Sequence, residues 1–253
     1  MTKFYRDQKV ELFYFTNPLC FHCWSHEPHL NRFLQIYDDY LDLHIIMGSA
    51  EDFQGSLSGE FKNEKLKEAH SLLPSKAFRV FSAVAPEKSL SFLRLMRSSF
   101  FTEQIDLSDE NNLKGLIQSL GERGGDIIES CKNGEGERRL QEDLRLGNRF
   151  TITKIPSLVM VHDGKIQTAM GELECDALRD QLSLLLGFEP AQCKLRSLKE
   201  ELKLAGRLYP RELEVLYNLN EDEIFRYVDE LLEKESYRWV KYDGGSYLEG
   251  THA

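Results

Sequence analysis

Two cysteines and three histidines stand close together near the amino terminus. The stretch NPLCFHCWSHEPHL, residues 17–30, holds Cys20 and Cys23 around a Phe-His pair, and His26 and His29 follow. Thiols separated by two residues are typical of redox dithiols and of metal sites. Three interpretations are therefore open: a redox dithiol, a metal site, or a helix start with incidental cysteines.

The redox interpretation depends on where the cysteines fall. Residues 9–15 are apolar and aromatic and predict a strand, and residues 21–37 have apolar side chains at helical spacing. Cys20 then stands at the helix N-terminus, where free N–H groups and the helix dipole should lower the pKa of its thiol. We expect Cys23 to be less exposed and to resolve a mixed disulfide on Cys20. A protonated His22 would stabilise the Cys20 thiolate further.

The metal interpretation would use Cys20, Cys23, His26 and His29 as ligands. On a helix each step of three residues turns the side chain by about 60°, so Cys20 and His29 would face nearly opposite ways, about 13 Å apart along the axis. Four tetrahedral zinc ligands lie within about 4 Å of one another. We therefore expect no metal and no cofactor, and we place His26 and His29 on the surface or in a groove.

The elements after the cysteines predict an α/β fold. Residues 41–48 predict a second strand, which completes a βαβ unit with parallel strands. Residues 58–150 predict helices, including one over 60–73 and one that begins after an N-cap at Ser108. Strand patterns return at residues 155–171, where two apolar runs flank Asp163-Gly164, the dipeptide of a tight hairpin. A helix over about 175–186 follows. We expect Cys131, Cys175 and Cys193 to serve local packing.

A second, smaller module is predicted after a linker at residues 187–193. Three helices and a hairpin at Asp243-Gly244-Gly245 indicate a winged-helix-like α+β domain. We expect Pro210 in the first turn of the second helix and a capping box of Asn220 with Glu223 at the start of the third. The predicted division is a domain at 1–190, with a helical insertion at about 50–150, and a C-terminal module at 191–253.

Charge argues against nucleic acid as a partner. The chain has 253 residues with 32 Lys and Arg against 42 Asp and Glu, a net charge of −10. Residues 221–235, the candidate recognition helix, carry seven acidic and two basic side chains, and phosphates would repel them. No apolar run reaches the length of a membrane span, and the first residues do not predict a secretory signal. We therefore expect a cytoplasmic protein that does not bind nucleic acid or membranes.

Four features together resemble the YjbH/SpxH family of low-GC Gram-positive bacteria. They are NPLCFHCWSHEP at residues 17–28, the helical insertion, TKIPSLVMV at residues 153–161 and the C-terminal module. The resemblance covers nearly the whole chain and implies a DsbA-like thioredoxin fold with a cis peptide bond before Pro156, beside the dithiol. It also implies a cytosolic stress-response adaptor that binds the regulator Spx and promotes its proteolysis by the protease ClpXP.

The resemblance leaves other functions open. Some members of the family carry a Cys/His-rich N-terminal segment linked to zinc, whereas residues 1–19 here contain neither residue type. The intact dithiol keeps a cytosolic DsbA-like thiol-disulfide oxidoreductase or isomerase as the alternative, with Cys20, Cys23, His22 and Pro156 as its redox site. Glutathione-dependent isomerases of the same class typically have serine at the position of Cys20. The sequence favours a non-enzymatic adaptor.

Overall fold

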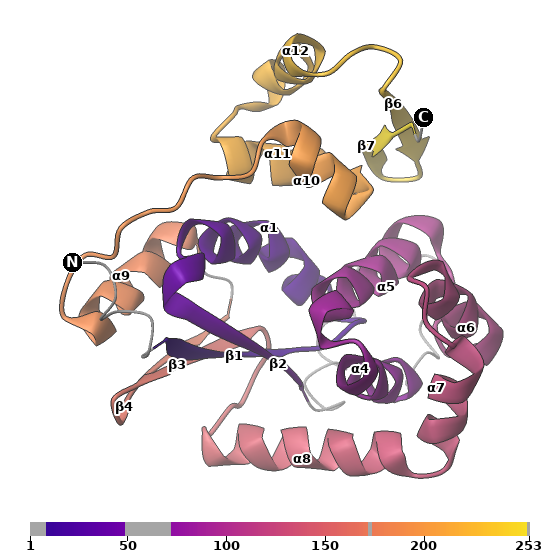
Figure 1. Ribbon diagram of the computed structural model, residues 1–253, viewed down its shortest axis with the longest axis vertical. Coiled ribbons are helices and arrows are strands. Elements are labelled where there is room, and N and C mark those ends of the chain that lie inside the picture. Colours follow the sequence, from indigo (N-terminus) through magenta and orange to yellow (C-terminus); the bar gives the residue numbers. More distant parts are fainter. Residues whose placement is uncertain (1–8, 49–71, 172–173, 252–253) are drawn as a thin grey trace.

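A four-stranded mixed sheet lies at the centre of the molecule (Figure 1). The computed structural model describes residues 9–48, 72–171 and 174–251. The strand order is β2-β1-β3-β4, in which β1 pairs parallel to β2 and antiparallel to β3, and β3 pairs antiparallel to β4. The strands are β1 (Val10–Thr16), β2 (Leu41–Met47), β3 (Ser157–His162) and β4 (Lys165–Met170). The predicted βαβ unit and the hairpin at Asp163-Gly164 are confirmed.

Helices cover both faces of this sheet. Successive side chains of a strand point to opposite faces, so Leu12 and Tyr14 of β1 enter the main core, whereas Phe13 and Phe15 belong to a separate cluster. Helices α1 (Phe21–Ile36) and α9 (Cys175–Leu186) lie on one face, and α8 (Glu135–Arg149) crosses the other (Figure 1). Both faces of β1 are therefore buried, which explains its nearly continuous apolar sequence.

The helical insertion, defined as residues 73–149, packs beside β2. Its other helices are α4 (Leu73–Val84), η2 (Pro86–Lys88), α5 (Ser89–Glu103), α6 (Glu110–Ser119) and α7 (Gly124–Lys132). The predicted N-cap at Ser108 is wrong: the Asp109 carboxylate accepts the N–H groups of Asn111 and Asn112, while Ser108 hydrogen-bonds to Asp106. Most of the helix predicted over 60–73 lies outside the described residues.

Asp143 joins the insertion to the sheet. Its carboxylate accepts the backbone N–H of Met47 at 2.8 Å and pairs with Arg79 at 2.8 Å, and its side chain is only 3% exposed. Burial raises the pKa of this carboxyl to about 6, although Arg79 and the Met47 N–H both oppose the rise. One side chain on α8 therefore ties both the last residue of β2 and helix α4 into a single body.

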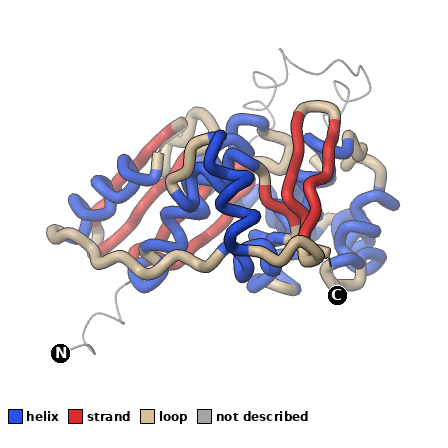
Figure 2. Tube along the Cα trace, turned by 90° about the horizontal axis from the view of Figure 1, so that it is seen from above, coloured by secondary structure: helices blue, strands red, loops and turns tan. Residues whose placement is uncertain are grey.

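The C-terminal module, defined as residues 198–250, has the element order of a winged helix. Its elements are α10 (Leu198–Ala205), β5 (Arg207–Leu208), α11 (Pro210–Tyr217), α12 (Glu221–Leu231), β6 (Tyr237–Tyr242) and β7 (Gly245–Gly250). Its sheet has the order β5-β7-β6 and stands apart from the central sheet (Figure 2). The capping box of Asn220 with Glu223 and the place of Pro210 are confirmed. The two-residue strand β5 was too short to predict.

The two parts have separate hydrophobic cores but touch extensively. One core of buried residues extends from Val10 to Leu185, and another from Leu198 to Leu248. Helix α11 packs on α1, so the C-terminal module sits on the helix that carries the cysteines (Figure 1). The domain boundary at residues 190/191 stays a prediction. Among the described residues, no helix has the length and apolar character that crossing a bilayer requires.

A candidate redox site under a second module

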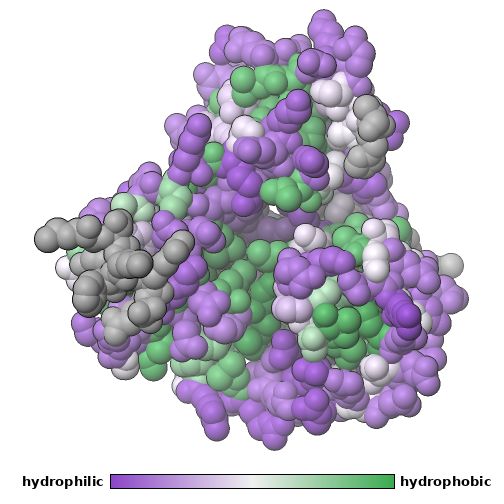
Figure 3. Space-filling view, in the orientation of Figure 1, coloured by the Kyte–Doolittle hydropathy of each residue, from purple (hydrophilic) through white to green (hydrophobic). Residues whose placement is uncertain are grey.

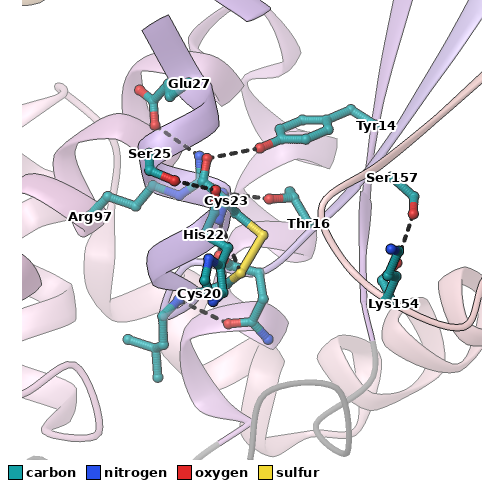
Figure 4. Close-up of a disulfide and its surroundings, with 12 residues drawn as sticks. Tyr14, Thr16, Cys20, His22, Cys23, Ser25, Glu27, Arg97, Lys154 and Ser157 are labelled. Carbon is teal, nitrogen blue, oxygen red and sulfur yellow. Dashed lines mark hydrogen bonds and ion pairs between the residues drawn. A yellow bond between two sulfur atoms is a disulfide. The ribbon is translucent and has the colours of Figure 1, made fainter. Parts of the chain in front are cut away.

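Cys20 and Cys23 form a disulfide at the start of α1 (Figure 4). Their Cα atoms are 5.2 Å apart. Cys20 is the N-cap residue of the helix, and its sulfur accepts the backbone N–H of Cys23 at 3.1 Å. The first turn of α1 contains no acidic side chain, so nothing in that turn opposes negative charge on Cys20. This placement is the one that the redox interpretation requires.

The disulfide is enclosed. Both Cys20 and Cys23 are 0% exposed, so the expectation that Cys23 is the less exposed of the two is wrong. The enclosing cluster comes from β1, β2 and the segment that enters β3. Its other buried members are Phe15, Ile46, Ile155 and Val159. A partner thiol therefore cannot reach either sulfur atom in this conformation without displacing the atoms that cover them.

Two further predicted site residues lie near the disulfide. The peptide bond between Ile155 and Pro156 is cis, as predicted. Because Ile155 packs in the same cluster as both cysteines, Pro156 stands beside the disulfide at the start of β3. His22 lies in the first turn of α1 and is exposed. The roles of Cys20, His22, Cys23 and Pro156 in redox chemistry stay predictions.

A buried arginine supports the loop before the cysteines, and the sequence interpretation missed it. Arg97 on α5 is 0% exposed and donates to Glu27 at 2.8 Å, to the Thr16 hydroxyl and to the Asn17 carbonyl at 3.2 Å (Figure 4). Burial lowers the pKa of this guanidinium, but Tyr14 and Glu27 raise it by more, so the pKa lies above its ordinary value. The charged guanidinium therefore holds the end of β1 against α1.

The ion pairs continue into the C-terminal module. Arg94, one turn before Arg97 on α5, lies 3.6 Å from Glu27 and makes a two-pronged contact with Glu212 of α11. The same guanidinium donates to the carbonyl of Arg207 in β5. Glu212 in turn accepts the Tyr209 N–H at 2.8 Å, which caps α11. Arg94 thus links α1, the helical insertion and the C-terminal module.

Aromatic rings fill the same junction. Trp24 stacks on Phe101 with ring centroids 4.8 Å apart and meets Tyr209 edge-on at 5.5 Å. The Tyr209 hydroxyl lies 2.8 Å from the Ser98 hydroxyl. A groove of about 560 Å³, the junction groove, opens between α1 and the module and is lined by Trp24, Tyr209 and Tyr242. The space-filling view shows the molecule hollowed between the C-terminal module and the body below it (Figure 3).

His26, His29 and the three other cysteines lie outside the disulfide. His26 and His29 both line the junction groove, as predicted. Cys131 and Cys175 are buried in the main core, and burial raises the pKa of each thiol to about 11. The sulfur of Cys193 lies 3.6 Å from the Asp39 carboxylate. In the described ranges, no three His, Cys, Asp or Glu side chains gather closely enough to hold a metal ion.

A disulfide at the start of α1, a cis-proline beside it and a helical insertion after β2 define a DsbA-type thioredoxin-fold protein. The chain belongs to the thioredoxin family, whose profile matches residues 13–174. Among solved structures, it is similar to a Nitrosomonas europaea protein described as a disulfide isomerase, with TM-score 0.60 and 23% identity over 71% of this chain and 98% of that one. The predicted fold class is confirmed.

Relatives with assigned names extend the likeness beyond the thioredoxin fold. The chain is 21% identical to the ClpXP adapter protein SpxH of Shouchella clausii, over 94% of this chain and 87% of the relative. It is 21% identical to the SpxH of Bacillus subtilis, over 85% and 80%. The cytosolic disulfide reductase DsbM of Pseudomonas aeruginosa matches over 70% of this chain, with 18% identity and TM-score 0.53. The resemblance to the YjbH/SpxH family is confirmed.

Proposed function

We propose that this chain is an adaptor that binds the regulator Spx and promotes its proteolysis by ClpXP. The observation that carries the proposal is the extent of the likeness. The SpxH relative from Shouchella clausii aligns with 94% of this chain, whereas the disulfide reductase structure aligns with 70%. The adaptor likeness therefore includes sequence beyond the thioredoxin fold, and a module that is packed on α1 gives a protein partner a surface composed of two parts.

Enclosure of the disulfide supports the same function. An enzyme that exchanges disulfides must present a sulfur atom to its substrate, whereas Cys20 and Cys23 are 0% exposed. An adaptor needs no chemistry. It must only bind one conformer of its partner more tightly than the other, because a ligand shifts an equilibrium by its differential affinity alone. A tenfold rise in a minor conformer requires about 1.4 kcal/mol of preference.

The first prediction is that the chain accelerates degradation of purified Spx by ClpXP, and that its dithiol is not required. We expect the Cys20→Ser/Cys23→Ser variant to accelerate degradation to within about twofold of the unmodified chain, because two enclosed sulfur atoms contribute little to a protein interface. Degradation is followed under reducing conditions with no addition, with the chain and with the variant. No acceleration by the unmodified chain would remove the adaptor function. A folded variant that is inactive would show that the dithiol is essential.

The alternative is a cytosolic thiol-disulfide oxidoreductase. The observation that favours it is the disulfide at the helix N-terminus with Pro156 beside it, an arrangement that suits exchange once the sulfur atoms are uncovered. A Cys23→Ser variant used as bait in the native cell separates the two functions. A spread of trapped mixed disulfides would favour the enzyme, and Spx alone would favour the adaptor.

The second prediction is that the C-terminal module does not bind DNA. This agrees with the proposal of a cytoplasmic protein whose partners are other proteins and not membranes. Helix α12 with the residues up to Glu235 carries a net charge of −5, and Asp222 and Glu230 are exposed on it. We expect no retardation of duplex DNA in a gel-shift assay at low salt, where attraction to phosphate is strongest. Submicromolar binding under these conditions would contradict the prediction.

A further inference from the structure

A largely buried series of alternating charges connects the loop before the disulfide to the C-terminal module. We define the charge chain as Arg97, Glu27, Arg94 and Glu212. Their side chains are 0%, 16%, 17% and 6% exposed, in that order. At one end Arg97 donates to the carbonyl of Asn17, and at the other Glu212 belongs to α11. The charge chain therefore begins at the loop that leads into Cys20 and ends in the C-terminal module.

Buried charges of this kind cannot move independently. A carboxylate or guanidinium that loses its partner inside a protein is left uncompensated in a medium of low dielectric, which is costly. Glu27 faces both arginines, and Arg94 faces both glutamates. If Glu27 moves with the first turns of α1, Arg94 must either move with it or stay with Glu212 and so resist the movement. The charge chain has the connectivity that can transmit a shift between the two modules.

The end of the charge chain near the disulfide is the part that a chemical change, reduction of the Cys20–Cys23 bond, can alter. Reduction breaks the bond between the sulfur atoms, which must then separate to ordinary contact distance. Cys20 caps α1 through its sulfur, and the turn that it caps carries Trp24. Trp24 is held between Phe101 and Tyr209, and close-packed side chains of this kind do not absorb a shift without moving their neighbours.

We propose that the redox state of the Cys20–Cys23 pair and the docking of the C-terminal module are thermodynamically coupled through this junction. The structure holds the module docked on α1 while the disulfide is closed, and the direction of the proposed coupling is that closing the disulfide strengthens docking. Coupling of two equilibria is reciprocal: if oxidation favours the docked module, loss of docking must favour the reduced pair by the same factor. The proposal concerns the chain alone and does not depend on an adaptor role.

The test is the thiol-disulfide equilibrium of the full chain with dithiothreitol. In this reaction the Cys20–Cys23 bond accepts two electrons and two protons and becomes two thiols, while dithiothreitol becomes its cyclic disulfide. The reduced fraction is measured by alkylation of the new thiols and mass spectrometry. Two variants weaken the module end of the charge chain. Glu212→Gln removes one charge, and Glu212→Leu removes the carboxylate altogether, so that each leaves the Arg94 guanidinium without its charged partner on α11. Circular dichroism establishes that both are folded.

We expect both variants to shift the equilibrium about fivefold toward the dithiol, a factor typical of coupled sites. The matched control is Glu122→Gln, since Glu122 pairs with Lys88 at 2.5 Å inside the helical insertion. The control should keep the equilibrium of the unmodified chain. The proposal is overturned if either Glu212 variant leaves the thiol-disulfide equilibrium unchanged, or if the Glu122→Gln control shifts that equilibrium equally.

Discussion

Replacing Arg97 by methionine is expected to lower the free energy of unfolding by about 3–5 kcal/mol. The guanidinium is fully buried and satisfies Glu27, the Thr16 hydroxyl and the Asn17 carbonyl. Methionine has similar length but no donor, so it would leave the Glu27 carboxylate with its more distant ion-pair partner among the described residues, Arg94 at 3.6 Å. Urea unfolding followed by circular dichroism measures the change.

The control for this substitution is Arg123→Met. Arg123 also pairs with a carboxylate, that of Asp126 at 3.7 Å, but its side chain is 89% exposed. Water screens such a pair, so the midpoint of unfolding should hardly change. If Arg97→Met proved as mild as this control, the idea that Arg97 anchors the loop before Cys20 would have to be abandoned.

Shortening Ile155 to alanine is expected to speed reduction of the disulfide by about tenfold or more. If the sulfur atoms react only after the cluster opens, the rate follows the population of the open form. Truncating a buried isoleucine destabilises the closed form by about 2 kcal/mol or more, and 1.4 kcal/mol corresponds to a factor of ten. Ile155 is 7% exposed in the cluster that contains both cysteines. The measurement is the rate of reduction by glutathione under pseudo-first-order conditions.

Val161→Ala provides the comparison. Val161 packs against the same cluster but pairs with Glu11, near the opposite end of β1 from the cysteines. Truncation there should change the reduction rate much less than truncation of Ile155. Equal rates for Ile155→Ala and the unmodified chain would mean that glutathione reaches the sulfur atoms without any opening of the cluster.

The sequence predicted the elements that carry local signals. β1, α1 and β2 have clear apolar periods, Asp163-Gly164 marks a hairpin, and the ends of α9 were close to those observed. Helix α7 lies inside the range of residues 58–150 that was predicted to be helical, although it begins with two glycines, which are poor helix formers. Gly124 is required there by packing, since a Cβ atom would lie 2.5 Å from the carbonyl oxygen of Lys114 on α6.

The candidate site was predicted only in part, because many of its contacts join residues that are far apart in the sequence. The spacing of Cys20 and Cys23 and their place before a helix are visible in the sequence. The partnership of Arg97 with Glu27 is not, because 70 residues separate them and either could have been an ordinary surface charge. One signal was available: Arg97 shares a helix face with Leu93, four residues before it, and with Phe100, three residues after it, and a solvated arginine is unexpected on such a face. The enclosure of the cysteines depends equally on contacts between distant segments.

The connection between α9 and α10 limits what the C-terminal module can do if it ever leaves α1. The Cys193 N–H donates to the Ile36 carbonyl at 2.7 Å, which fastens the connection to the end of α1. Only residues 194–197 then separate this point from α10, and four extended residues span at most about 14 Å. A detached module would remain at an effective concentration of about millimolar or higher beside its own docking surface. Any competitor for that surface would therefore have to bind against an intramolecular rival that never diffuses away.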